Sequence, residues 1–532
     1  MALPAANTAW PPAPWDLAYR AYAENEAWYL GDTDALEKIY RRAEQGDYSR
    51  RGTPMRGGIV GTASRMFWGR PVPAGQTRTR LHIPAAADLS TLSSDLLFSE
   101  PPEVQLAVAE VSGASASILV AGPSKEQQRL DLIANSDAAH AMFNTMGELK
   151  SALGATVITS AWDTDVADHV WLECTAVDVV VPEFRKGKLI ACTMWTEYQS
   201  GSVFWRHLER HEPGRIEHAL YQGTADNVGR RIPLEERPET AYLAKMVDGD
   251  SAILTGITGL TASYNLNMPT RSWRKKGELA FAGRSDYAGL HPLFDALDEC
   301  MSSWMRDLKL GGGKILVPDA ALQSNGIGAG GSFDMGQEAF AGLNMPGEVG
   351  KLAMEKVQFD IRVDEHEATA FALYREILRA SGFSQSAWGD YSSGSAQTAT
   401  EVNDRDKASE RTRAKKTLYD KVAIAEQSAV ALELDGILFP GKGGGYFERP
   451  TVVFPDVSQI DPEKLARTIQ LLDAAGAAST RRKVELANAD WTDAQVDEET
   501  ERIRTDRGTV PDPATFTGFE PINPPDQEEP TP

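Results

Sequence analysis

Cysteine is scarce in this chain of 532 residues, which holds only Cys174, Cys192 and Cys300, widely spaced and without a CxxC pair. This usage indicates a reducing compartment and argues against a disulfide framework. No apolar run approaches the roughly 18 residues of a membrane-spanning helix. The N-terminus has neither the basic nor the apolar region of a signal peptide. We therefore expect no membrane partner.

Positive charge is also in short supply. The chain has 54 Lys and Arg against 76 Asp and Glu, which gives a net charge of −22. Tight nucleic-acid binding draws its affinity from cations that neutralise phosphates, so this balance opposes stable DNA binding. It does not oppose a passage through which DNA must move without being held.

Motifs for catalysis and metal binding are missing as well. Gly311-Gly-Gly-Lys314 lacks the first glycine and the Ser/Thr of a phosphate-binding loop, and it follows a helical pattern. His207 and His211 have helical spacing but no His-Glu-x-x-His motif, so we interpret them, with His218, as surface histidines near a strand end. There is no Gly-x-Ser-x-Gly elbow. We expect no enzyme activity, cofactor or metal.

The most informative segment that is present joins a helix-like stretch at 369–381, a polar loop from Gly382, and about forty residues without proline or glycine. The first half of this long segment is almost wholly polar. An apolar stripe follows in its second half, at Leu418, Val422, Ala425, Ala429 and Leu432. We expect a helix of roughly 60 Å that lies half in a core and half against solvent, another subunit or a cavity.

The remaining patterns predict a multi-domain α+β protein. A helix capped by Asp32 is expected near the N-terminus, and residues 154–229 are rich in strands. The other expected elements are a helix at 87–98, a β-hairpin at 104–120, one long helix at 124–153, an amphipathic helix at 290–308, a glycine-rich module at 311–350, a strand pair formed by 436–440 and 451–454, and helices at 462–477, 480–488 and 492–503.

A cluster of charges occupies the first half of the long helix. Its positive members are Arg405, Lys407, Arg411, Arg413, Lys415 and Lys416, and its negative members are Glu401, Asp404, Asp406 and Glu410. The alternation of signs favours an ion-paired face, either solvated or between subunits, over a DNA-binding patch.

The order of these parts resembles the portal proteins of tailed double-stranded DNA bacteriophages, of the siphophage or actinobacterial-phage type. The resemblance covers about residues 15–505. The segments that carry it are 87–102, 198–234, 290–308, Thr398-Ala-Thr-Glu-Val402 with Arg411-Thr-Arg-Ala-Lys-Lys416, and 492–503. The Thr-Ala-Thr-Glu-Val segment is the most specific of them.

The resemblance implies a portal fold assembled as a ring of about twelve subunits around a central channel. Its regions are a wing at 1–285, a first stem helix at 286–309, a clip at 310–362, a second stem helix at 363–381, a channel loop at 382–397, a long wing helix and strand pair at 398–458, a crown at 459–505, and a disordered acidic tail at 506–532. The second stem helix is short for the family.

The same resemblance implies a site without catalytic residues. The segment from Ser384 to Ser395 is expected to project into the channel, and its DNA-facing residues are Gln385, Ser386, Trp388, Asp390, Tyr391, Ser392 and Ser393. The ring-contact residues are Glu401, Arg405, Arg411, Arg413 and Lys415.

The implied partners are further copies of the chain, double-stranded DNA that passes through without sequence-specific contact, the terminase large subunit, the head-completion (adaptor) protein, and the major capsid and scaffolding proteins. The implied location is the portal vertex of the virion, with the host cytoplasm during assembly. Two alternatives stay open: another ring-forming structural or scaffold protein of a virion, and an enzyme with an unrecognised site.

Overall fold

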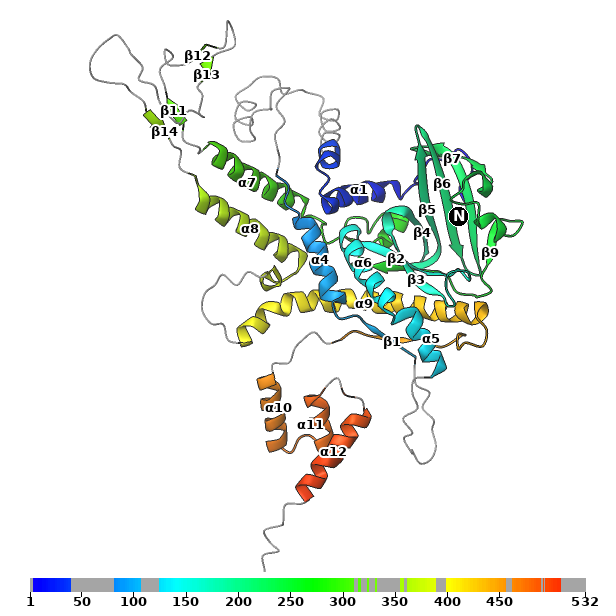
Figure 1. Cartoon of the computed structure of the whole chain (residues 1–532), viewed down its shortest axis with the longest axis vertical. Coiled ribbons are helices and arrows are strands. Elements are labelled where there is room, and N and C mark those ends of the chain that lie inside the picture. Colours follow the sequence, from blue (N-terminus) through cyan, green and yellow to red (C-terminus); the bar gives the residue numbers. More distant parts are fainter. Residues whose placement is uncertain are drawn as a thin grey trace, which may run out of the picture. The chain divides into compact units, whose positions relative to one another are not determined.

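The structure is a computed structural model in which residues 3–39, 81–106, 124–310, 314–316, 323–324, 331–332, 355–357, 361–388, 399–455, 462–488, 491 and 493–508 are described. The chain separates into two compact units, Met1–Pro455 and Asp456–Pro532. Helices and antiparallel sheets both contribute to the first unit, which confirms the predicted α+β class (Figure 1). No described helix is both long and apolar enough to cross a bilayer.

Three antiparallel sheets build much of the first unit. The largest has the order β4-β5-β6-β7-β8, with β9 paired to β7; a second has the order β10-β2-β3, and a third joins β1 to β15. The strands are β1 (Glu103–Gln105), β2 (Ala155–Ala161), β3 (Trp171–Ala176), β4 (Val180–Arg185), β5 (Lys188–Ser200), β6 (Val203–Glu212), β7 (Arg215–Thr224), β8 (Asn227–Ile232), β9 (Ala252–Leu254), β10 (Ala262–Leu266) and β15 (Thr451–Val453).

Helices pack against these sheets around an aromatic-rich core. They are α1 (Asp16–Leu30), α4 (Ala85–Phe98), α5 (Lys125–Ala134), α6 (Asp137–Leu153), α7 (His291–Leu310), α8 (Val363–Ser381) and α9 (Ala399–Leu438). Trp15 and Trp28 of the N-terminal segment share one buried cluster with Leu89 of α4 and with Phe294 and Leu297 of α7. Burial of such large apolar side chains supplies most of the stabilisation in a core of this kind.

The predicted helix at 124–153 is in fact two helices. Ser124 caps α5 through Gln127 N (3.1 Å), and Ser136 caps α6 through Ala139 N (3.3 Å). Between them, Asn135 uses its side-chain amide to hold β1, with Nδ2 donating to the Val104 carbonyl at 2.9 Å. A second capping serine therefore explains the break that the apolar pattern did not show. The predicted cap at Asp32 is confirmed, since Ala35 N donates to Asp32 Oδ1 at 2.9 Å.

The predicted strand pair at 436–440 and 451–454 is wrong. Helix α9 continues to Leu438, and β15 pairs with β1, Val452 lying opposite Val104. Gly436 does not break the helix. A Cβ there would lie 2.5 Å from the Gly444 carbonyl carbon, so the glycine permits close approach of the 441–445 loop, whose Gly445 N donates to Leu432 O at 2.9 Å.

Of the predicted hairpin at 104–120, only residues 104–106 are described. They form the end of β1 and the residue that follows it. In the region predicted as the clip, short strands are present: β11 (Lys314–Leu316) pairs with β14 (Glu355–Val357), and β12 (Gln323–Ser324) with β13 (Gly331–Ser332). The remaining clip residues and the acidic tail from residue 509 lie outside the described residues. The division into wing, stem, clip and crown stays a prediction.

The second unit contains three helices, close to the predicted ranges: α10 (Pro462–Ala474), α11 (Thr480–Ala487) and α12 (Asp493–Gly508). Its buried side chains among the described residues are Val484, Val496 and Thr500. Exposed ion pairs tie the helices together, including Arg481 Nε with Asp497 Oδ1 at 2.7 Å.

Candidate functional site

The base of the predicted channel loop is well defined. Helix α8 ends at Gly382, which has a φ of +91° and donates its N–H to the Leu378 carbonyl. A left-handed glycine of this kind is a common helix terminus. Phe383 and Ser384 follow and are buried, so Ser384 does not project as predicted.

Two hydroxyls of α9 hold this loop base. Ser384 N donates to Ser409 Oγ at 2.9 Å, and the Ser384 and Ser409 hydroxyls lie 2.8 Å apart. One turn later, Thr412 Oγ1 donates to the Gly382 carbonyl at 2.6 Å. These contacts, which we call the loop clamp, fix the end of α8 against α9. Sequence reasoning missed Ser409 and Thr412, because small polar residues on a polar helix give no distinctive pattern.

The predicted DNA-facing residues fall mostly beyond the clamp. Gln385 is exposed, and Ser386 is half-buried with its hydroxyl donating to Ser384 Oγ at 3.1 Å. Trp388 ends a short 3₁₀ turn, Gln385–Trp388, but its side chain is outside the described set. Asp390, Tyr391, Ser392 and Ser393 also lie outside the described residues. Their role in a channel stays a prediction.

Helix α9 buries polar side chains alongside apolar ones such as Ile424 and Leu434. Lys416, Asp420, Gln427 and Asp435 of this helix are all nearly inaccessible. Each has a partner on a different element: Asp286 for Lys416, Lys150 of α6 for Asp420, Ser160 of β2 for Gln427, and Arg129 of α5 for Asp435. We call these four contacts the α9 polar ladder.

The ladder consists mainly of ion pairs with additional hydrogen bonds. Arg129 donates two hydrogen bonds to the Asp435 carboxylate, from Nε at 2.6 Å and from Nη2 at 2.8 Å, and Val170 N donates a third at 3.0 Å. Asn265 Nδ2 donates to Asp420 at 2.8 Å. Such extra bonds are what allow a charge to be buried at all.

Burial and charge act against each other on the ionisable groups of the ladder. Burial lowers the pKa of Lys150, and Asp420 opposes that effect. For Asp286, burial alone would raise the pKa of the carboxyl, but Lys416 and the hydrogen bonds from Ser151 and Asn267 outweigh it and lower the pKa. The paired carboxylate is therefore retained as an anion inside the protein.

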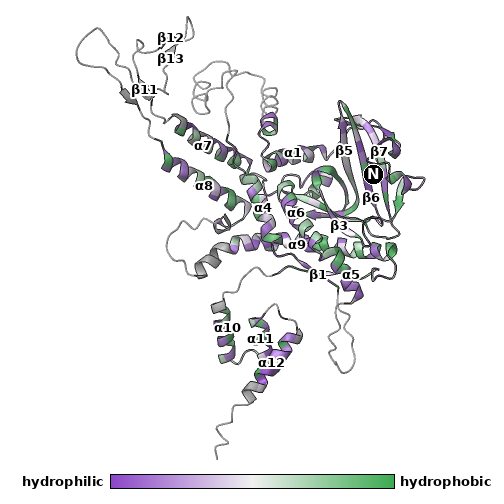
Figure 2. Ribbon diagram, in the orientation of Figure 1, coloured by the Kyte–Doolittle hydropathy of each residue, from purple (hydrophilic) through white to green (hydrophobic). Residues whose placement is uncertain are grey.

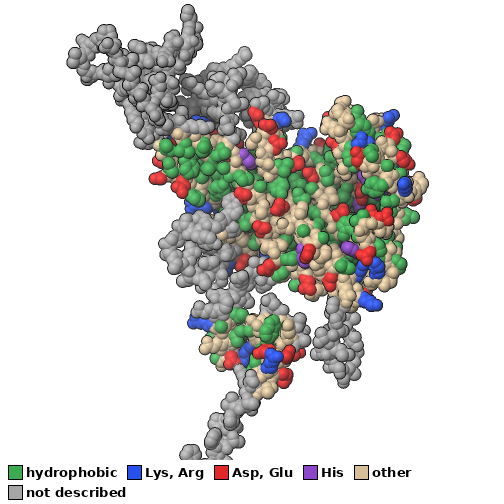
Figure 3. All heavy atoms as spheres, viewed as in Figure 1, with side chains coloured by type: hydrophobic (Ala, Val, Ile, Leu, Met, Phe, Trp, Pro, Cys, Tyr) green, Lys and Arg blue, Asp and Glu red, His purple; other side chains and the backbone are tan. Residues whose placement is uncertain are grey.

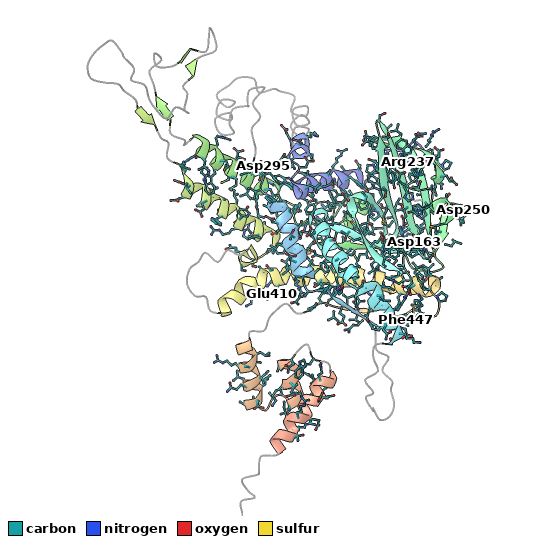
Figure 4. All side chains as sticks on the ribbon, in the orientation of Figure 1. Asp163, Arg237, Asp250, Asp295, Glu410 and Phe447 are labelled. Atoms are coloured by element: carbon teal, nitrogen blue, oxygen red, sulfur yellow. The ribbon has the colours of Figure 1, made fainter. Side chains whose placement is uncertain are left out.

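The apolar stripe predicted on α9 is only partly buried. Ala425 and Leu432 are buried and Ala429 is intermediate, but Leu418 is 65% and Val422 43% exposed. The prediction failed because α9 packs on the subunit through the face that carries Asp420, Ile424 and Leu434, which leaves Leu418 and Val422 on the outer side. The N-terminal part of α9 is mostly hydrophilic (Figure 2), and Figure 4 marks Glu410 there and Phe447 near its C-terminal half.

A groove of about 700 Å³ lies beside the outward side of α9. Val422, Glu426 and Val430 of α9 line one side of it, and Phe281, Leu260 and Tyr446 contribute apolar surface elsewhere. Three apolar side chains that line the groove or lie close in sequence to residues lining it are exposed: Leu418, Ile437 and Tyr446. We call Leu418, Val422 and Ile437 the outer α9 stripe.

The predicted ring-contact residues divide into three groups. Arg411 and Lys415 are exposed, whereas Glu401 and Arg405 lie on α9 with side chains outside the described set. Arg413 works within the subunit, because its Nε donates to the Leu96 carbonyl and its Nη2 to the Pro455 carbonyl, both at 2.8 Å. Lys416 of the same cluster is buried on Asp286.

The helices α7 and α8 lie side by side and expose a second apolar surface (Figures 1 and 3). Trp304 stacks on His366 with ring centroids 6.0 Å apart, and Asp307 pairs with Arg362 at 2.8 Å. Exposed large apolar side chains on this pair are Met305, Leu308, Val363 and Phe371. A patch of this kind on two adjacent helices is typical of a surface that another chain covers.

The histidines predicted to lie on the surface are buried. His207, His211 and His218 are each less than one-tenth exposed and lie on β6 and β7. The alternation of a strand, which places every second residue on one face, is the signal that sequence reasoning overlooked. No group of ligands arranged to hold a metal ion occurs among the described residues.

Comparisons with known proteins give distant structural likenesses only. No family model and no curated protein matches the chain. A chain of the native gene transfer agent (GTA) virion is 14% identical, with a TM-score of 0.37, and the match covers 81% of this chain and 99% of that chain. A chain of the native GTA neck, with C12 symmetry, is 15% identical (TM-score 0.36; 82% and 95% covered).

A chain from the neck of the empty GTA particle, with C6 symmetry, is 14% identical, with a TM-score of 0.38 and coverage of 81% of this chain and 98% of that chain. These TM-scores are too low for the likeness to carry an argument about fold or function.

Proposed function

We propose that this chain is the subunit of a phage portal, a ring at one capsid vertex through which double-stranded DNA is packaged and later ejected. The observation that carries the proposal is the outer α9 stripe. Helix α9 already packs into the core through Ile424 and Leu434, yet it leaves Leu418 and Val422 exposed on a surface that the single chain does not cover. Ring closure through two different faces of each subunit would cover it.

The exposed face of α7 and α8 supports the same arrangement. Met305 and Phe371 project from a helix pair that one loop, clamped by Ser409 and Thr412, connects to α9. In the proposed ring, these helices surround the channel and the loop beyond Ser386 reaches the DNA. Inter-subunit contacts run along 288–309 and 398–434.

The proposed channel has no catalytic residues and holds no cofactor. The net charge of −22, repeated around a ring, disfavours tight binding of a polyanion and lowers resistance to its passage. In this proposal the motor activity comes from a terminase large subunit, and the ring also meets an adaptor protein and the major capsid and scaffolding proteins. The location is the virion, with the host cytoplasm during assembly.

Negative-stain electron microscopy of the purified full-length chain tests the assembly. We expect top views of rings of about twelve subunits with a central hole. The double variant Leu418→Asp/Val422→Asp is expected to lose these rings, whereas Val166→Asp, at a more exposed site in a turn, keeps them. Compact particles without a hole would support another structural or scaffold role instead.

The loop assignment has its own test. Ser392→Lys/Ser393→Lys is expected to leave rings intact but to slow DNA packaging or release, more strongly at low salt, because each lysine adds a phosphate contact. Packaging and ejection at the wild-type rate at both low and high salt would contradict the placement of this loop at the DNA.

A further inference from the structure

Four polar side chains gather on one face of the six-stranded sheet. His207, Glu209 and His211 occupy alternate positions of β6, and His218 of β7 lies directly opposite Glu209. Alternate residues of a strand share a face, so all four side chains lie on the same side of the sheet. We call them the histidine cluster. Nothing in the proposed channel function uses it.

The two cross-strand imidazoles form a stacked pair. The rings of His207 and His218 are nearly parallel, at 5°, with centroids 5.3 Å apart. His207 Nε2 and His218 Nδ1 lie 3.2 Å apart, within hydrogen-bonding distance. One of these two nitrogens must therefore carry a proton and donate a hydrogen bond, and the other must be unprotonated and accept that bond.

The third imidazole is held by two partners. His211 Nδ1 lies 2.6 Å from Thr261 Oγ1, and His211 Nε2 lies 3.0 Å from Glu209 Oε1. His211 is buried, whereas the Glu209 side chain is 37% exposed. The carboxylate thus connects the buried imidazoles to solvent.

Few other ionisable groups among the described residues face this cluster. On β5, opposite β6, Cys192 faces His211, while Met194 and Thr196 face Glu209 and His207. Burial raises the pKa of the Tyr242 hydroxyl, and the charge of Glu209 adds to that effect, as do those of Asp163 and Glu173. Arg231 reaches only the main-chain carbonyl of His218, at 3.4 Å.

We propose that the histidine cluster is an acid-sensitive device of the sheet, which accepts one proton between His207 and His218 and loosens the β6–β7 pair when a second arrives. Two neutral imidazoles carry two ring protons, one of which makes the shared bond. When one proton is added, one of the four ring nitrogens is still unprotonated and can accept the shared hydrogen bond. A second puts a proton on all four nitrogens, which removes the hydrogen bond and sets two positive charges side by side.

The direction of the proton equilibria agrees with this geometry. Burial lowers the pKa of His218 from 6.5 to about 4, and it also lowers the pKa of His207. Burial alone would raise the pKa of Glu209, but the His211 hydrogen bond and the nearby imidazoles hold it at about 2. The two imidazoles therefore bind more protons in the unfolded chain than in the folded chain below pH 6.5, and their contribution to stability falls as the pH drops from 6.5 towards 4.

Exchange of the imidazole C2 hydrogen, followed by mass spectrometry on the full-length assembled protein, measures each histidine separately. We expect His218 to titrate near pH 4 and His207 to titrate below its ordinary pKa, with His140, a partly exposed residue of α6, followed in the same run as a reference for the exchange measurement. Titration of both His207 and His218 near pH 6.5 would overturn the proposal. This measurement needs no variant and so does not depend on refolding.

A variant tests whether the cluster controls stability. The wild-type melting temperature is expected to fall by roughly 3–6 °C between pH 7 and pH 5, and His218→Gln is expected to reduce that fall by about half, because glutamine keeps a hydrogen-bonding group that does not titrate. The control His140→Gln should keep the wild-type slope. An unchanged slope in His218→Gln would contradict the proposal.

The same melting series, run first in EDTA and then with Zn²⁺, separates a proton device from a metal site. We expect no change on adding Zn²⁺. A rise in melting temperature that needs Zn²⁺ and disappears in His218→Gln would replace the acid-sensitive device with a metal site.

Discussion

Helices α7 and α9 are both long, and both leave apolar residues exposed, but α7 is held mainly by apolar packing, whereas α9 adds several buried ion pairs to the apolar packing of residues such as Ile424 and Leu434. α7 buries Phe294 and Leu297 among aromatic neighbours from the N-terminal segment. α9 buries Lys416, Asp420 and Asp435 against charges on three other segments. Each ion pair of the ladder joins α9 to one particular residue of another segment and is lost when the helix slides by one turn.

This difference indicates separate tasks for the two helices. Buried ion pairs add little net stability, because desolvation offsets most of their attraction, but they can fix one arrangement of the chain. A 40-residue helix that carries the loop clamp near one end benefits from such fixed register. The ladder also frees the outward face of α9 for apolar residues, which in the proposed ring meet a neighbouring subunit.

The largest loss of stability is expected when one partner of a ladder ion pair is removed. Asp420→Ala leaves Lys150 buried without a counter-charge, and the free energy of unfolding should fall by about 3–5 kcal/mol. Urea denaturation measures this, with Glu410→Ala on the exposed side of α9 as the control at less than about 0.5 kcal/mol. Lys150→Met/Asp420→Leu should recover much of the loss. A double variant as unstable as the single one would contradict the account of the ladder.

Shortening a buried side chain of α7 is expected to leave a cavity and lower the free energy of unfolding. Leu297→Ala should cost about 2–4 kcal/mol, because Leu297 is fully buried beside Phe294. Met305→Ala, on the exposed face of the same helix, is the matched control and should cost little in the isolated subunit. Equal losses in the two variants would mean that the outer face of α7 is covered within the subunit.

A smaller effect is expected at the loop clamp. Ser409→Ala removes the acceptor for Ser384 N and should cost about 1 kcal/mol. Amide hydrogen exchange should rise at 383–386 and stay unchanged in the α9 ladder. The control is Lys415→Ala, at an exposed position six residues after Ser409 on α9. It should leave the hydrogen exchange at 383–386 unchanged. The same increase in both variants would rule out a specific role for Ser409.

The smallest effect is expected from removing the tail. Truncation after Gly508 should change neither the melting temperature nor the ring size, because the acidic, proline-rich segment has few apolar groups to offset its ordering entropy. Ring size by light scattering checks this. Loss of rings would mean that the tail packs between subunits.

The sequence was informative where one helix meets an apolar surface. The spacing of Phe294, Leu297 and Met301 predicted α7, and the α+β class is confirmed. The buried face of α9 was not predictable in this way, because Asp420 and its partner Lys150 are separated by 270 residues and neither follows an apolar period. Pairing of β15 with β1 depends on an even more distant contact, between Val104 and Val452. The clamp residue Ser409 lies only 25 residues from Ser384, and it was missed because a small polar residue on a polar helix gives no distinctive pattern.

The central claim is that the outer α9 stripe is an interface between copies of this chain in a ring. The most direct measurement is the molar mass of the purified protein at micromolar concentration and physiological salt, by sedimentation velocity or native mass spectrometry. Wild type should have a mass of about twelve times 57.9 kDa, and Leu418→Asp/Val422→Asp should be a folded single subunit. A monodisperse wild-type species of 57.9 kDa would contradict the account.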